Sequence, residues 1–178
     1  MVRHINVVHI SEVTSEALKT LDGSSFGALR QRVGAAVGAN KLGYSFFTVP
    51  PGKAAFPFHL HNRNKELIYI VEGNGTLRLR NSEVTVSSET FIACPLGHDL
   101  PHQLINTAQS DLRYLVVSTM EYPEIAEYPD SNKIGAYVTS ASSGATKGFR
   151  ALYIADTGVS YYEGEDGSEI ERVKKGKG

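Results

Sequence analysis

The stretch HLHNRNKE, residues 59–66, decides how the rest of the chain is interpreted, because it places three metal-ligating side chains between two strand-like runs. Residues two apart in a β-strand face the same way, so His59 and His61 project together while Leu60 faces the other side. The turn NRNK then reverses the chain and brings Glu66 back level with both histidines. Two neutral ring nitrogens and one carboxylate oxygen meeting at a point suit a divalent first-row metal, namely iron, manganese, nickel, copper or zinc.

A second segment, PLGHDLPHQLIN, offers a further histidine ligand at two positions, His98 and His102. His102 opens the apolar run HQLIN, which is expected to lie in the wall of the fold with Leu104 and Asn106 facing inward. His98 stands in the preceding loop. We therefore predict that His102 is the fourth ligand and that His98 lies at the rim.

Short apolar runs bounded by turn-forming residues fill the chain from Gly43 to Met120. About eight such runs follow one another at close spacing, and no convincing helix separates them. This pattern is typical of an antiparallel sandwich or barrel. The composition agrees, because Gly, Val, Ile, Thr, Tyr and Phe favour strands and turns over helices.

The N-terminal flank is expected to contribute one strand and one short helix. Val2 to Ile10 alternates enough for an edge strand, and SEVTSEALKTL resembles a short helix or a turn of helix with Ser11 or Thr14 as its cap. The segment from Asp22 to Lys41 is rich in Gly, Ser and Ala and predicts no definite element.

The C-terminal flank begins after Met120, where the pattern of short apolar runs ends. EYPEIAEYPDSNKIG, with two Tyr-Pro pairs, predicts an extended arm over the surface. ASSGATKG predicts a loop, FRALYIA one more strand, and the polar tail is expected to fray.

Length and charge limit the possible partners. A chain of 178 residues suits one domain, and 18 Lys+Arg against 19 Asp+Glu give no broad attraction to nucleic acid or to an anionic membrane. The single cysteine, Cys94, forms no internal disulfide, and neither a secretory segment nor a membrane span is visible. These features favour a cytoplasmic protein that binds a small molecule.

The metal-ligating residues and the glycines around them resemble the first motif of the cupin superfamily. That motif reads G, five or six residues, H-x-H, three or four residues, E, six residues, G. This sequence matches it at Gly52, His59, His61, Glu66 and Gly73.

The second cupin motif runs G, five residues, P-x-G, two residues, H, three residues, N. It is matched here at Pro95, Gly97, His102 and Asn106. Four residues rather than two separate Gly97 from His102, and Ser88-Glu89 replace the usual Gly-Asp turn. Both departures lie in expected loops.

The resemblance implies an all-β double-stranded β-helix, a jelly-roll barrel, over about residues 43–120. Residues 1–42 would be an N-terminal extension and residues 121–178 a C-terminal arm and tail, all within one domain spanning 1–178. The flanks are similar to those of a group of single-domain bacterial cupins. The resemblance further implies a homodimer and one divalent metal held by His59, His61, Glu66 and His102.

Alternation along the strands predicts how other side chains face. Ile68 and Ile70 should point inward and Tyr69 away from the metal, while Phe47 or Phe58 adds to an apolar pocket. Cys94 is expected to be a buried small hydrophobe.

Arg78 and Arg80 alternate with Leu77 and Leu79, so two registers are open. If the leucines face the core, the arginines face solvent or a partner subunit, which we favour because unpaired buried cations are costly. The opposite register would aim both guanidinium groups into the pocket, where they would hold an anionic substrate.

The expected function is that of a metal-dependent enzyme acting on a small oxygen-rich compound, either a dioxygenase or a sugar or keto-acid isomerase or lyase. The alternative is a cupin that binds or senses a small ligand without chemistry, and a purely structural role needs no ligand. Catalytic residues are not identified by the sequence, since Glu72 and His98 are candidate bases without known geometry. The fold alone does not select a reaction.

Overall fold

The structure is a computed structural model that describes residues 4–19, 25–97, 99–138 and 149–176. Strands dominate these residues, and the paired strands run antiparallel. Their bounds are β1 Ser15–Lys19, β2 Gly27–Gln31, β3 Leu42–Val49, β4 Leu60–His61, β5 Glu66–Glu72, β6 Asn74–Leu79, β7 Glu83–Ser87, β8 Phe91–Cys94, β9 His102–Ile105, β10 Leu112–Thr119, β11 Glu124–Tyr128, β12 Lys133–Tyr137 and β13 Arg150–Ile154. The helical elements are short, namely η1 Ile10–Glu12, α1 Val33–Ala36, η2 Pro129–Ser131 and α2 Ser168–Lys175.

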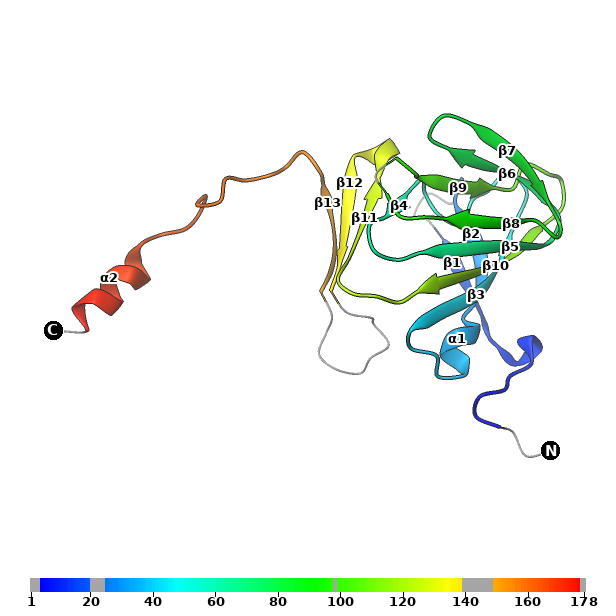
Figure 1. Ribbon diagram of the computed structural model, residues 1–178, viewed down its shortest axis with the longest axis horizontal. Helices are drawn as coiled ribbons and strands as arrows, with labels where there is room; N and C mark the ends of the chain where they lie inside the picture. Colours follow the sequence, from blue (N-terminus) through cyan, green and yellow to red (C-terminus); the bar gives the residue numbers. More distant parts are fainter. Residues whose placement is uncertain (1–3, 20–24, 98, 139–148, 177–178) are drawn as a thin grey trace.

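The strands form two layers of a jelly roll (Figure 1). One layer is a six-stranded sheet in the order β1-β2-β3-β10-β5-β8. The other layer consists of a four-stranded sheet, β13-β12-β11-β4, and a three-stranded sheet, β7-β6-β9. A bridge between His59 and His102 joins these two sheets beside β4 and β9. The predicted all-β double-stranded β-helix is thus confirmed, and eight strands, β3 to β10, fall in the predicted barrel region.

The core lies between the two layers and follows the predicted alternation. Ile68 and Ile70 on β5 are 5% and 0% exposed, whereas Tyr69 between them is half-buried and contacts the ring of the outward Phe91. Phe47 also points inward and stacks on Tyr114 with ring centroids 5.5 Å apart. Burial of these apolar side chains is the main stabilising contribution to such a fold.

Two motif glycines are required by the backbone. Gly73 has φ +89°, and a Cβ there would lie 2.5 Å from the carbonyl oxygen of Asp111; Gly52 has φ +72°. Glycine adopts this left-handed region without steric cost. Glu89, in the Ser88-Glu89 pair that replaces the usual Gly-Asp turn, has φ +70°, so a non-glycine residue is held in the left-handed region there.

The prediction of an edge strand at the start of the chain is wrong, and of the predicted helix or turn of helix only one turn, η1, is present. The described residues before Ile10 form no strand, and SEVTSEALKTL is not a helix but begins with the end of η1 and continues into β1. The η1 N-cap is His9, whose ring accepts a hydrogen bond from the amide of Ser11. Strand β1 forms because its backbone pairs with β2 over the register Ser15–Gln31 to Lys19–Gly27, and this tertiary pairing overrides helix propensity.

The C-terminal arm is extended, as predicted, but it forms a sheet instead of lying loosely over the surface. β11 and β12 make a hairpin around η2, and β11 pairs with β4, the strand that ends in His61. The predicted return strand is β13 (Figure 1). The loop predicted at 141–148 lies outside the described residues.

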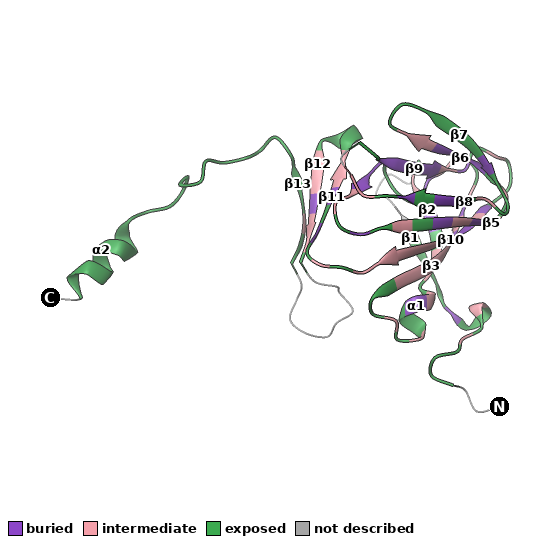
Figure 2. Cartoon of the chain, viewed as in Figure 1, coloured by how far each residue is buried: buried purple, intermediate pink, exposed green. Residues whose placement is uncertain are grey.

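The polar tail carries the helix α2, which is exposed throughout (Figure 2). This corrects the expectation of a frayed tail. No described helix combines the length and the apolar character needed to cross a membrane.

Candidate metal centre

His59 and His102 are direct partners across two strands. The amide of His59 donates to the carbonyl of His102 at 3.1 Å, and the amide of His102 donates back to His59 at 2.8 Å. Directly paired residues place their side chains on the same face, and the two imidazole centroids lie 4.6 Å apart. The register of the second layer therefore brings together two histidines that are distant in the sequence.

His61 and Glu66 complete the cluster from opposite layers. His61 lies two residues beyond His59 on the same face, with ring centroids 5.0 Å apart, as the strand alternation predicted. Glu66 opens β5 in the facing sheet, and its Oε2 lies 3.7 Å from Nε2 of His61 and 3.5 Å from Nε2 of His102. Ligand atoms of His59, His61 and Glu66 all lie within 4.8 Å of one another.

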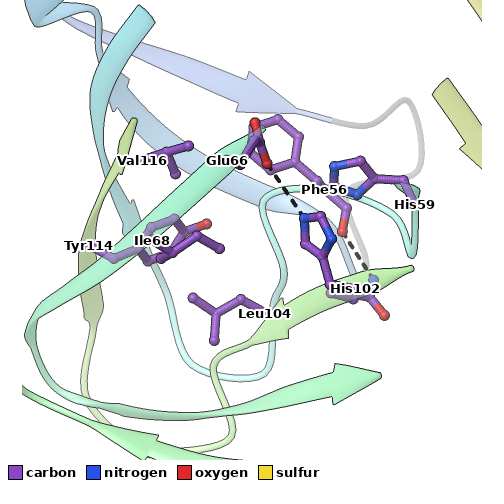
Figure 3. Close-up of a pocket in the computed structure, with 9 residues that line it drawn as sticks. Phe56, His59, Glu66, Ile68, His102, Leu104, Tyr114 and Val116 are labelled. Carbon is purple, nitrogen blue, oxygen red and sulfur yellow. Dashed lines mark hydrogen bonds and ion pairs between the residues drawn. The ribbon is translucent and has the colours of Figure 1, made fainter. Parts of the chain in front are cut away.

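Figure 3 shows His59, Glu66 and His102 converging on a cavity from different strands. The remaining wall is largely apolar, with the Tyr114 side chain and the Gln103 amide as further polar groups. Phe56 closes one side, and its carbonyl accepts a hydrogen bond from Nε2 of Gln103 at 3.0 Å. The lining consists of Phe56, His59, Glu66, Ile68, His102, Gln103, Leu104, Tyr114 and Val116.

The protonation of the histidines suits a cation. Nδ1 of His59 lies 2.8 Å from the carbonyl of Pro57, so it donates its proton there and leaves Nε2 with a free lone pair. Burial, followed by the nearby His102, lowers the pKa of His59 to about 4, which keeps the ring neutral at physiological pH. Both ring nitrogens of His61 and of His102 are buried without a hydrogen-bond partner among the described residues.

Glu66 is held as a carboxylate. Burial raises its pKa, but the contact with His102 and the electrostatic interactions with the rings of His61 and His59 outweigh burial, so the pKa lies below its usual range. A buried anion beside three imidazole rings whose lone pairs lack partners is an incomplete polar cluster. A divalent cation would satisfy these donor atoms, and the residues present fit such an ion.

Glu124, which the sequence interpretation missed, orders the turn between the histidines and Glu66. It is 3% exposed and accepts hydrogen bonds from the amides of Asn62, Arg63 and Asn64 at 3.1, 3.2 and 2.7 Å, and also from the side-chain amide of Asn64. Its Oε2 lies 3.7 Å from Nδ1 of His61. Carboxylates commonly orient metal-binding histidines from this side.

No local pattern indicated this role, because Glu124 lies about sixty residues after the turn that it holds. Its place on the inner face of β11 follows from the pairing of Ala126 with His61. Once that register is known, Glu124 and Tyr128 share the face of the histidines, and the ring of Tyr128 lies 6.2 Å from that of His59.

The two arginines follow the favoured register. Leu77 is buried and Leu79 packs against the core, so Arg78 and Arg80 face away from the pocket. Arg78 forms two hydrogen bonds to Asp130, at 2.6 and 2.8 Å, and stacks over the ring of Phe58. It therefore fastens the β11–β12 hairpin to β6 instead of holding a substrate in the cavity.

The remaining candidates have no place in the cavity wall. Cys94 is buried as predicted, and burial, followed by the charge of Glu66, raises the pKa of its thiol to about 12. Glu72 is exposed at the end of β5 and is not among the lining residues. His98 lies outside the described residues.

Residues 45–118 match the profile of the cupin domain family. Together with the jelly-roll fold and the two motifs, this match identifies residues 45–118 as a cupin domain. A search of curated proteins gives no match.

Several solved structures share the fold. A proposed sugar phosphate isomerase from Acidithiobacillus ferrooxidans is 24% identical with TM-score 0.71, over 85% of this chain and 92% of that one. A sugar phosphate isomerase of the cupin superfamily from Silicibacter pomeroyi is 21% identical with TM-score 0.71, over 87% and 97%. The polyketide cyclase RemF from Streptomyces resistomycificus is 24% identical with TM-score 0.54, over 70% and 84%. At these identities the likeness shows the fold alone.

Proposed function

We propose that the protein is a metal-dependent cupin enzyme that acts on a small oxygen-rich organic compound, with His59, His61, Glu66 and His102 as ligands of one divalent transition metal. The observation that carries the proposal is the convergence of His59, His61 and Glu66, with Nε2 of His102 3.5 Å from Glu66. The buried ring nitrogens of His61 and His102 have no hydrogen-bond partner among the described residues. Iron, manganese, nickel, copper and zinc all suit this donor set.

The bound metal would supply Lewis-acid activation of substrate oxygens or, for a redox-active ion, reaction with dioxygen. The chain itself would exclude water with Phe56, Ile68 and Val116 around the cavity. Glu124 would keep His61 in one orientation through the turn that it holds.

Tyr114 is the group best placed to orient a substrate. It lines the cavity and is 2% exposed. Burial, followed by the charge of Glu66, raises the pKa of Tyr114, so its hydroxyl stays protonated and donates a hydrogen bond to a substrate oxygen. Replacement of Tyr114 by Phe should therefore raise KM while leaving the metal content unchanged.

The reaction class that we favour is that of a sugar or keto-acid isomerase or lyase. Dioxygenation is the other class. The two sugar phosphate isomerase structures, which cover most of this chain, support the first class by fold-level analogy. Turnover of sugars, sugar phosphates and keto acids, followed by proton NMR with and without oxygen, separates the two classes.

The decisive experiment is elemental analysis of the purified protein and of protein reconstituted with each of the five metals, combined with this turnover screen. We expect about one metal per chain and turnover that disappears with the metal. Protein that takes up none of the metals would refute the proposal.

A non-catalytic binding role is the second candidate, and one observation favours it. The acidic groups nearest the cavity, Glu66 and Glu124, are both engaged, so no free carboxylate among the described residues stands ready as a general base. A metal-loaded protein that binds a ligand tightly and returns it unchanged would select this role.

The predicted homodimer also remains a proposal. Leu67, Tyr69 and Phe91 form an outward apolar patch on β5 and β8, with Phe91 70% exposed, and a second subunit would bury it. Analytical ultracentrifugation of the protein and of Phe91→Ser tests this assembly.

A further inference from the structure

The four-stranded sheet extends the face that carries the histidines beyond the barrel. Ala126 on β11 pairs with His61, and on β12 Lys133 pairs with Tyr128 and Tyr137 pairs with Glu124. Paired residues share a face, so the side chains of Lys133 and Tyr137 lie on the side of the sheet that holds the metal-binding residues. β12 and β13 thus extend the sheet beyond β4 and β11, and we call these two strands the apron (Figure 1).

Two tyrosines, Tyr128 at the end of β11 and Tyr137 at the end of β12, are joined by their hydroxyl groups. The hydroxyl oxygens of Tyr128 and Tyr137 are 2.9 Å apart. Gly135, between them on the sheet, makes room for this contact, because a Cβ there would lie 2.6 Å from the hydroxyl of Tyr137. Only one of the two hydroxyl hydrogens is used between the rings, so the other remains available to an acceptor.

A basic side chain lies beside the ring of each tyrosine. Nζ of Lys133 lies 5.9 Å from the ring centroid of Tyr128, and Cζ of Arg150 lies 4.9 Å from that of Tyr137. Neither cation forms an ion pair with a carboxylate of the described residues. Cation–π contacts hold such groups in place but leave their charge uncompensated. Arg78, by contrast, is neutralised by Asp130.

We propose that Lys133, Arg150 and the Tyr128–Tyr137 hydroxyl pair form a subsite for an oxyanion, namely the phosphate or carboxylate group at the end of the substrate remote from the metal. The inference rests on the proposed metal centre, since the ring of Tyr128 links this subsite to His59 at 6.2 Å. Two cations and a free hydroxyl hydrogen are donors only, and such a set selects an anion.

The surroundings of the tyrosines agree with a donor role. Burial, followed by the hydrogen bond to Tyr137, raises the pKa of Tyr128, so this hydroxyl remains protonated. Glu124 shares the same face, but its oxygens accept the amide hydrogens of the turn after His61. Asp130 is bound to Arg78 on the hairpin. The described carboxylates around the apron are therefore occupied elsewhere.

The test uses pairs of ligands that differ only in the terminal anion. Erythronate 4-phosphate is compared with erythronate, and 2-hydroxyadipate with 2-hydroxyhexanoate, by calorimetric titration of metal-loaded protein. We expect at least one anionic member to bind about tenfold more tightly than its partner. The phosphate pair and the carboxylate pair distinguish the two sources of the oxyanion.

Variants assign the gain to the subsite. Lys133→Gln combined with Arg150→Gln should remove the advantage of the anionic ligand while elemental analysis finds the same metal content. Arg113→Gln is the matched control. Arg113 also lies over an aromatic ring, that of Phe46, but it belongs to β10 and not to the four-stranded sheet. It should leave the advantage unchanged.

Equal affinity within both ligand pairs, or an advantage that survives in the double variant, overturns the subsite and leaves the metal centre standing. If the protein takes up no metal, the proposed function fails, and inorganic phosphate titrated into the metal-free protein tests the subsite alone. Phosphate binding that is about tenfold weaker in the double variant than in Arg113→Gln would then support the subsite, and equal binding would overturn it.

Discussion

The two ends of the chain both add strands to the cupin barrel, but only one of them reaches the cavity. β1 and β2 extend the six-stranded sheet beyond β3, and no described residue before Lys41 lines the cavity. β11 pairs instead with β4, so the C-terminal hairpin lies beside the histidines and brings Glu124 into the cluster. The two extensions thus lie at edges of different sheets, and Figure 1 shows β11, β12 and β13 side by side at one end of the barrel.

The comparison indicates that the position of the sheet edge decides whether an added strand only stabilises the barrel or also contributes side chains to the candidate metal centre. An open sheet edge offers backbone groups to any strand that reaches it. At β3 the added strands protect an edge and bury apolar side chains. At β4 the same kind of pairing places new side chains on the face that carries the proposed ligands. Four predictions test this contrast, from the largest expected effect to the smallest.

Replacement of His61 by Ala should abolish metal binding. It removes a ligand, so we expect a loss in affinity of more than the 10–100-fold that follows removal of a ligand's hydrogen-bond partner. Elemental analysis and melting temperature with added metal measure the effect, since a ligand of the native state stabilises it. His4→Ala, in the exposed N-terminal extension, should bind metal normally. Normal binding by His61→Ala would remove His61 from the ligand set.

The metal-free protein should lose stability as the pH falls from about 6.5 to about 4. Burial lowers the pKa of His59 from 6.5 to about 4 in the folded state, so over this range the unfolded chain binds the additional proton. At 1.36 kcal/mol per pKa unit, the loss amounts to about 3 kcal/mol.

Urea unfolding at several pH values measures this loss. His59→Gln should flatten the pH dependence, whereas His4→Gln should keep it. A dependence unchanged in His59→Gln would assign it to another group.

Replacement of Glu124 by Gln tests whether the C-terminal extension contributes to metal binding. Gln keeps the size of the side chain but loses the charge that attracts the amides of Asn62 and Asn64, so we expect about 2 kcal/mol of destabilisation. Metal affinity should fall by about 10–100-fold through His61.

Glu16→Gln is the matched control in the N-terminal extension, where Glu16 pairs with Arg30 at the surface. It should change metal affinity by less than about twofold, because surface ion pairs contribute little. Equal metal affinity in the two variants would contradict the contrast between the extensions.

Replacement of Asp130 by Asn should have the smallest effect. Asp130 is 50% exposed, so its pair with Arg78 stabilises the hairpin by about 0.2–1 kcal/mol after screening by solvent. The hydrogen bond from Arg78 lowers the pKa of Asp130, so this contribution is present above the unfolded pKa of 3.8 and is lost as the pH falls through the folded pKa. The urea midpoint at neutral pH and at acidic pH measures it, and metal content should not change.

The barrel and its four candidate ligands were predictable because each rests on a short-range pattern. Alternation places His59 and His61 on one face, the turn returns Glu66, and glycines mark tight turns such as that at Gly73. The structure brings ligand atoms of His59, His61 and Glu66 within 4.8 Å of one another. It places Nε2 of His102 3.5 Å from Oε2 of Glu66, while the role of all four side chains as ligands remains a prediction.

The prediction of a helix at the N-terminus was wrong because the conformation of these residues depends on a long-range contact. Its residues tolerate either conformation, and pairing with β2 selects the strand. The local conformational propensity of a segment does not indicate whether a partner strand lies beside it in the folded protein.

The sequence by itself determined the cupin barrel, the inward alternation of β5 and the candidate ligands, since these depend on periodicities of a few residues. Only the tertiary structure decided that β11 pairs with β4, that Glu124 holds the turn after His61, and that Lys133 and Arg150 share the face of the histidines. These contacts join residues far apart in the chain. They depend on which sheet edge each extension meets, and no short stretch of sequence carries that information.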